Sequence, residues 1–296
     1  MALTLDLASV PPFIWEKIGS WCTANAVNEV DIVIARGPDN TPSQLSDCTV
    51  GIHRQAPGME SWERLPRLRA IRTHQQQRII AREGTKPEVV VAVDLDEYLL
   101  PSADQIRISV ETVRSSHWDV LAANGWIHLG DRKGMYDFFA LVLNDRSYWG
   151  PHLYENMNEA MDIFEDVAGS DEPYEVRSAF GGLGVFKFRG VWDGGSSHCD
   201  YNAVAPDDFR VWGCGNVGCD EWCEHVGFHE CLRAANSGLR VGISGRLPVH
   251  WSSDYNSNND RRALHGQTSK NGHEGALMNY TAGTAGTVQA APIPRL

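Results

Sequence analysis

The sequence predicts an α/β fold with a single mixed, mostly parallel sheet flanked by helices, and three observations lead to it. Strand-like and helix-like segments alternate through the first third of the chain, as in βαβ units. The run EVVVAVDL (88–95) is nearly continuous and β-branched, which is typical of a strand buried on both faces of a mainly parallel sheet. A length of 296 residues with 42% hydrophobic residues is enough for a large domain with a real core.

The elements of the first third follow from residue spacing. The helix over 61–83 is polar and basic, and it is expected to begin after Pro66 and to end near Gly84. The four elements ahead of the strand at 88–95 are expected to be helices at 11–27 and 61–83 and strands at 31–37 and 49–54.

The remaining elements are less regular. A change to a Ser-, Asn-, Gly-, Thr- and Ala-rich composition after Trp251 predicts one domain over 1–251 and a flexible low-complexity tail over 252–296. Within the domain we expect strands at 118–125, 136–143 and 178–188, an acidic helix near 155–168, a helix over 220–236 and a final strand pair over 239–251.

Charge and composition exclude several classes of protein. The net charge of −12 disfavours a nucleic-acid partner, because phosphate neutralisation requires basic surfaces. No stretch approaches the roughly 18–20 apolar residues of a membrane span, so no integral membrane segment is expected. The first residues show neither a basic region nor a small-residue cleavage site, which predicts a cytoplasmic protein.

Two carboxylates follow the strongest strand. Asp94 and Asp96 stand at its end, and in open α/β sheets ligands bind beyond the carboxyl ends of the strands. Side chains at i and i+2 point the same way while the chain stays extended. Their oxygens suit Mn²⁺ or Mg²⁺, which would bridge phosphate oxygens. The alternative is an ordinary solvated strand end that carries acidic residues.

This Asp-x-Asp pattern after a central strand resembles the GT-A glycosyltransferases, and the resemblance extends over about residues 30–251. It implies the GT-A fold, a nucleotide-sugar donor and a divalent cation. By the same resemblance, Asp96 would bind the metal directly, while Asp94 would contact the ribose or a water of the metal.

A second constellation runs from Cys223 to Trp251 and is similar to the family segment that begins with an acidic pair and ends with a histidine. The resemblance implies that Glu224 and His225 supply the catalytic base or contact the acceptor hydroxyl, and that His250 is a third metal ligand. The family commonly has Asp at the position of His225. The form C-E-H-x-x-F-H more closely resembles capsule- and cap-associated mannosyltransferase relatives of fungi, algae and large viruses.

Supporting residues come from three other segments. RSAFGGLGVFKFRG (177–190) resembles the family strand beneath the donor sugar, where Gly181 and Gly182 would let the backbone approach the ligand. Arg72 stands where relatives carry an arginine that faces the nucleotide. Asp137 is a candidate to hold an acceptor hydroxyl. A bulged strand and a solvated helix face are the alternatives for the glycines and for Arg72.

The seven cysteines allow three interpretations. Reduced thiols are the default for a chain without a secretory signal. A structural zinc site could form from the cluster Cys214, Cys219, Cys223 and Cys231 with His225 and His229, although its spacings differ from common zinc modules. Cysteine-bridged loops would form in an oxidising compartment.

These observations lead to one functional hypothesis with two rivals. The chain would be a glycosyltransferase that moves a hexosyl or deoxyhexosyl group from a nucleotide diphosphate donor to a glycan or glycoprotein acceptor, with Mn²⁺ or Mg²⁺ as cofactor. A non-catalytic glycan- or nucleotide-binding module is the first rival. A sugar nucleotidyltransferase is the second, but it requires a Gly-rich phosphate loop near the amino terminus, and none is visible.

Overall fold

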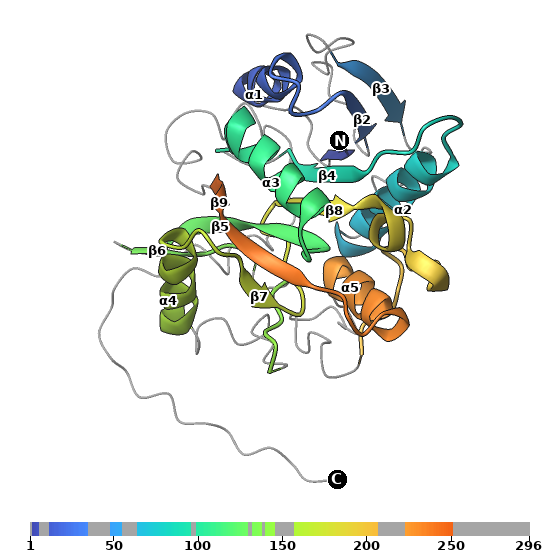
Figure 1. Cartoon of the computed structure of the whole chain (residues 1–296). Coiled ribbons are helices and arrows are strands. Elements are labelled where there is room, and N and C mark those ends of the chain that lie inside the picture. Colours follow the sequence, from blue (N-terminus) through green and yellow to red (C-terminus); the bar gives the residue numbers. More distant parts are fainter. Residues whose placement is uncertain are drawn as a thin grey trace, which may run out of the picture. The chain divides into compact units, whose positions relative to one another are not determined.

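A computed structural model describes residues 2–5, 12–34, 48–54, 64–95, 99–129, 132–137, 140–145, 157–206 and 223–250 of the chain. Over these residues one nine-stranded mixed sheet is flanked by helices (Figure 1). The predicted α/β class and the mixed sheet are confirmed.

Strand order places the first third of the chain, β1 to β4, at one side of the sheet. The order is β3-β2-β1-β4-β8-β5-β9-β7, and β6 pairs with β5 outside this path. The strands are β1 Ala2–Leu5, β2 Glu29–Ile34, β3 Thr49–Arg54, β4 Val89–Asp94, β5 Val120–Leu129, β6 Arg132–Met135, β7 Tyr174–Val176, β8 Leu183–Lys187 and β9 Val241–His250.

Most strands run in one direction. β1 to β4 are mutually parallel, β8 is antiparallel to both β4 and β5, and β9 is parallel to β5. Among the described strands β1, β2, β3, β4, β5 and β9 therefore share one direction, while β6, β7 and β8 oppose it. The carboxyl ends of the six strands meet at the same edge.

The two faces of the sheet carry separate cores. The helices are α1 Pro12–Thr23, α2 Arg64–Ala81, α3 Ala103–Ser115, α4 Met157–Ala168 and α5 Glu224–Ala235. Strand residues alternate between faces: Val90 and Ala92 of β4 pack with α2, α4 and α5, whereas Val91 and Val93 pack with α1 and α3. This alternation directs Asp94, which follows Ala92 by two residues, toward α2 and α5.

Three expectations differ from the structure. Helix α3 has no counterpart among the expected elements, although Ser102 and Gln105 form the capping box that begins it. The strand expected at 136–143 is not found among its described residues, 136–137 and 140–143: Asp137 adopts φ 63° and breaks the extended run, and within these residues there is a single bridge, from Val142 to Ser178. The final strand pair is one long strand, β9. The predicted tail at 252–296 lies outside the described residues.

The described cysteines include two disulfides, Cys22–Cys48 and Cys199–Cys231, and one buried free thiol, Cys223. The expectation of reduced thiols is therefore wrong for four of the seven cysteines. Bridged loops, typical of an oxidising compartment, are the interpretation that the structure favours. No helix within the described ranges combines the length and apolar character that crossing a bilayer requires.

Candidate functional site

The residues singled out by the sequence gather at the edge where the parallel strands end. Asp94 is the last residue of β4, and His250 is the last of β9. Since β8 runs the opposite way, Gly181 and Gly182, which precede it, lie at this edge too, and the amide of Asp94 donates to the carbonyl of Gly182 at 2.9 Å. This is the edge at which open α/β sheets bind their ligands.

Arg72 occupies the centre of a buried ion cluster at this edge. Its side chain belongs to the inward stripe of α2, and the residue is 5% exposed. Nη2 donates to both carboxylate oxygens of Asp94, at 2.7 and 2.8 Å, and Nη1 donates to Oε1 of Glu224. Burial disfavours the charge, but Asp94 and Glu224 outweigh it and raise the pKa of Arg72. A buried guanidinium of this kind is stable only because it is paired.

His225 is enclosed by the same cluster. Its ring stacks on Phe180 with centroids 3.9 Å apart, and the edge of Tyr201 closes the other side at 5.3 Å. Nη1 of Arg72 contacts Nε2, which therefore acts as acceptor. Burial, then Arg72 and His229, lower the pKa of His225 well below its ordinary value, so the imidazole is neutral.

Gly181 and Gly182 form the floor of the site. Both have positive φ, 64° and 84°. The surroundings of Gly181 are tight as well: a Cβ on Gly181 would lie 2.4 Å from the carbonyl oxygen of Ala123, and one on Gly125 would lie 2.5 Å from the oxygen of Gly181. Only glycine satisfies both conditions at 181. The structure thus explains these glycines by close backbone packing between β5 and the start of β8.

Asp137 faces the same floor from the segment after β6. Its Oδ2 accepts a hydrogen bond from the amide of Gly181 at 3.2 Å. Its side chain is packed among protein atoms, yet the residue stays partly exposed. Burial, then Glu224 and Asp94, raise the pKa of Asp137 to about 7, against the opposing effect of Arg72.

His250 belongs to a neighbouring part of the edge. Its imidazole stacks on Trp126 at 3.7 Å with an interplanar angle of 11°, and Nζ of Lys133 lies 4.0 Å from the centre of the same indole ring. The backbones of His250 and Leu99 exchange two hydrogen bonds, of 3.1 and 3.2 Å. The chain just after the Asp-x-Asp motif is therefore tied to the end of β9.

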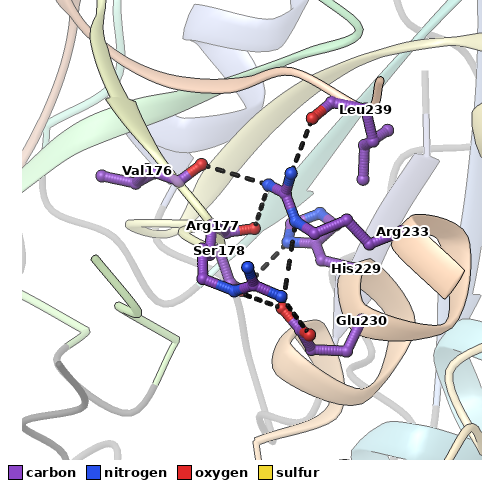
Figure 2. Close-up of polar contacts among 7 residues, drawn as sticks. All are labelled: Val176, Arg177, Ser178, His229, Glu230, Arg233 and Leu239. Atoms are coloured by element: carbon purple, nitrogen blue, oxygen red, sulfur yellow. Dashed lines mark hydrogen bonds and ion pairs between the residues drawn. The ribbon is translucent and has the colours of Figure 1, made fainter. Parts of the chain in front are cut away.

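A polar network anchors α5, whose first residues are Glu224 and His225 (Figure 2). Arg177 and Glu230 form a bidentate ion pair at 3.0 and 2.6 Å, and Nδ1 of His229 lies 2.9 Å from Oγ of Ser178. Arg233 donates to the carbonyls of Val176, Arg177 and Leu239. These contacts fix the helix against β7 and the segment that leads into β8.

The loop that carries Tyr201 is held at two points. The disulfide Cys199–Cys231 joins it to α5. The side-chain amide of Gln76, on α2, donates to the carbonyls of Trp192 and Cys199 at 2.6 and 3.0 Å. Tyr201 is consequently fixed against His225 from both neighbouring helices.

The structure brings most of the expected site residues together but separates one pair. Arg72, Asp94, Gly181, Gly182, Glu224 and His225 form one cluster. Hydrogen-bonded strands lie about 4.8 Å apart, so β4 and β9, three steps apart in the sheet, are separated by roughly 14 Å at the backbone. Asp94 and His250 thus come from strands that are not neighbours in the sheet, and Asp96 lies outside the described residues.

The expected zinc cluster and the aromatic residues of the site can also be compared with the structure. Among the described residues no group of three or more His, Cys, Asp or Glu side chains is arranged as a metal site. Cys231 is bonded to Cys199, so it is not available to the expected zinc cluster; Cys214 and Cys219 fall outside the described residues. Phe180 and Tyr201 are site residues that the sequence did not reveal, since aromatic residues in a chain rich in them give no distinguishing pattern.

Comparisons with known proteins add little to this geometry. No family model and no curated protein matches the chain. Solved structures that match include TarS of S. aureus (residues 1–349), at 12% identity over 85% of this chain and 60% of that chain, with a TM-score of 0.40. Another is a mycobacterial protein, at 15% identity over 85% of this chain and 65% of that one, with a TM-score of 0.36. The chain spans less than two thirds of either, and likenesses this loose support no conclusion about activity.

Proposed function

We propose that this protein is a metal-dependent glycosyltransferase that transfers a sugar from a nucleotide diphosphate donor to a glycan or glycoprotein acceptor. One observation carries the proposal: the buried Arg72 cluster stands at the carboxyl edge of the parallel strands, directly after the strand that leads into the Asp-x-Asp motif. A charged, enclosed site at that edge suits a diphosphate and its cation.

The charge of the cluster favours a cation. Arg72 is paired with two carboxylates, Asp94 and Glu224. Oε2 of Glu224 is enclosed and has no hydrogen-bond partner among the described residues. An enclosed carboxylate oxygen of this kind is unfavourable without a counter-ion.

The donor set fits Mn²⁺ or Mg²⁺. We assign the direct metal contacts to Asp96 and His250, because Leu99, three residues after Asp96 in sequence, is hydrogen-bonded to His250. Carboxylate oxygens suit either ion. When bound, the ion stabilises the negative charge on the departing diphosphate.

The remaining residues orient the reactants. Asp94 holds Arg72, whose guanidinium lies at the edge where the diphosphate would bind. The Gly181–Gly182 backbone lies beside the end of β4, where the donor sugar would approach.

The test is donor hydrolysis over a panel of nucleotide sugars with Mn²⁺, with EDTA and with Asp96→Ala. We expect metal-dependent release of one nucleoside diphosphate, and loss of that release both with EDTA and in the variant. Asp171→Ala is the matched control, because Asp171 is an aspartate whose side chain is 85% exposed and pairs with Arg246 at the surface. It should retain the wild-type rate.

Two outcomes would redirect the proposal. Release that is unchanged by EDTA and by Asp96→Ala would show that the ion is not required. No turnover of any donor, with no heat of nucleotide or Mn²⁺ binding by calorimetry, would overturn the catalytic assignment and favour a binding module.

A further inference from the structure

The proposed function leaves open which group takes the proton of the attacking hydroxyl, and any assignment of that group rests on the proposed function. The sequence offers Glu224 and His225 for this role. A general base has to reach the proton it removes, within about 2.6–3.2 Å. Access to the site is therefore the first criterion.

Glu224 does not meet this criterion. The residue is 2% exposed, and Oε1 is taken by the guanidinium of Arg72. The second oxygen, Oε2, is enclosed by protein atoms.

His225 is excluded on the same grounds. The residue is 1% exposed and is stacked between Phe180 and Tyr201. Its acceptor nitrogen, Nε2, contacts Arg72, and the other, Nδ1, is enclosed and has no partner among the described residues. An imidazole that faces a fixed positive charge resists taking up a proton.

Asp137 has the opposite properties. It is partly exposed, and Oδ2 of its carboxylate accepts from the backbone amide of Gly181 rather than from a guanidinium. Gly181 lies on the floor of the site, next to Gly182, whose carbonyl is bonded to the amide of Asp94. Gly181 and Gly182 therefore connect the Asp137 carboxylate to the end of β4, and Asp137 is partly exposed to solvent.

We propose that Asp137, rather than Glu224 or His225, accepts the proton of the attacking hydroxyl. The hydroxyl oxygen forms the new bond to the anomeric carbon, and the bond from that carbon to the phosphate oxygen breaks with its electron pair leaving on the diphosphate. The proton of the hydroxyl passes to a carboxylate oxygen of Asp137. Arg72 stays protonated throughout.

The surroundings of Asp137 support this role. Burial and the facing carboxylates of Glu224 and Asp94 raise the pKa of Asp137 to about 7, while Arg72 opposes them. A base whose pKa lies near the working pH is the most effective general base. The backbone of Asp137 adopts a positive φ of 63°, a conformation that persists only where the surrounding structure holds it.

The experiment replaces Asp137 and measures hydrolysis of the nucleotide sugar that the wild-type protein turns over, with water as acceptor. Asparagine tolerates positive φ and can still accept from Gly181, so Asp137→Asn keeps the fold while removing the base. We expect its rate to fall by about 10²–10⁴-fold, the usual contribution of a general base. Binding of the nucleoside diphosphate with Mn²⁺, measured by calorimetry, should stay unchanged.

A second variant separates a base from a structural role. Asp137→Gly accepts the φ of 63° and leaves room for a small carboxylate. Added formate should raise the rate of this variant by about tenfold or more by supplying the missing base. Formate should leave Glu224→Gln and the exposed control Asp171→Ala unaffected.

The outcomes distinguish this inference from the proposed function. A wild-type protein without any donor turnover would remove the proposed function and the inference together. An active wild-type protein whose Asp137→Asn variant keeps its rate, or formate rescue of Glu224→Gln instead of Asp137→Gly, would overturn the inference alone. Thermal unfolding of each variant confirms that it is folded at the assay temperature.

Discussion

Arg72 and Asp94 join α2 to the end of β4 through a single guanidinium nitrogen, which donates to both oxygens of the carboxylate. The other terminal nitrogen reaches Glu224 on α5. Three segments that are distant in the sequence are thereby fixed to one side chain, and the geometry of the site depends on it.

Removal of Arg72 should destabilise the protein strongly. Arg72→Met removes the partner of the buried Glu224 carboxylate and of the half-buried Asp94, and breaking a buried ion pair in this way typically costs about 3–5 kcal/mol. Urea unfolding at pH 7 measures the loss. The control is Arg82→Met, which breaks a surface pair with Glu29 whose side chains are 40% and 52% exposed, and should cost less than about 1 kcal/mol. Equal losses in the two variants would contradict the buried pairing.

Replacement of Gly181 should separate the energetic cost of a positive φ from the cost of steric crowding. In Gly181→Ala the new Cβ is placed on a residue with positive φ and clashes with the Ala123 carbonyl. In Gly190→Ala the φ is also positive, but no atom lies within 4 Å of the new Cβ. The φ alone costs about 1–2 kcal/mol, and crowding adds about 1–3 kcal/mol. Chemical unfolding should therefore show a larger loss for Gly181→Ala. A loss no greater than that of Gly190→Ala would mean that the backbone at 181 can relax.

The pH dependence of stability should reveal the raised pKa of Asp137. Its pKa is raised from 3.8 to about 7 in the folded protein, so the folded state binds the proton more tightly than the unfolded state. That contribution is fully present below about pH 4 and is lost as the pH rises through 7. Asp137→Asn should accordingly gain stability relative to wild type between pH 5 and pH 8. Thermal unfolding at both values tests this, and an advantage independent of pH would refute the shifted pKa.

His229 should give the pH dependence of stability the opposite sign to that from Asp137. Burial lowers its pKa from 6.5 to about 3, so the unfolded state binds more protons between those values. Stability from this residue is therefore present above about pH 6.5 and is lost as the pH falls toward 3. His229→Gln should show a flatter decline of its unfolding midpoint between pH 7 and pH 4 than wild type does. Parallel curves for the two proteins would rule out a buried neutral imidazole.

The disulfide Cys199–Cys231 should stabilise both the fold and the site. The bridge closes a loop with a sequence separation of 32, for which chain entropy predicts a contribution of about 3–4 kcal/mol. The double variant Cys199→Ser with Cys231→Ser should unfold at lower denaturant concentration than wild type. It should also lose rigidity at Tyr201, seen as faster amide exchange in the 193–205 segment. Wild-type stability and exchange in the variant would argue against a structural bridge.

Much of the fold could be predicted because burial patterns are local. The continuous run at β4 and the helical spacing of α1 and α4 specify their own elements. The strand expected over 136–143 failed because the chain turns at Asp137 and the apolar residues 140–143 pack into the core after it, which spacing does not encode. Helix α3 was missed although its capping box was visible in the sequence.

The site could be predicted only in part, for a physical reason. Arg72, Asp94, Gly181, Gly182, Glu224 and His225 do converge, because each belongs to a predicted element that reaches the same edge of the sheet. Which of them faces solvent depends on packing between elements, and that decides which carboxylate can act as a base. The ion pair of Arg72 with Glu224, across 152 residues, has no local signature.

The pairing of β5 with β9 has a further consequence. Ala123 pairs with Ser244, but Asn124 pairs with Pro248, so the three residues Gly245–Leu247 have no counterpart on β5. The two halves of β9 are therefore registered independently. Changes in the first half would alter the scaffold around β7, whereas the side on which His250 is presented depends only on the three residues that follow the bulge. One residue inserted there would turn the imidazole to the opposite face, since side chains alternate along a strand.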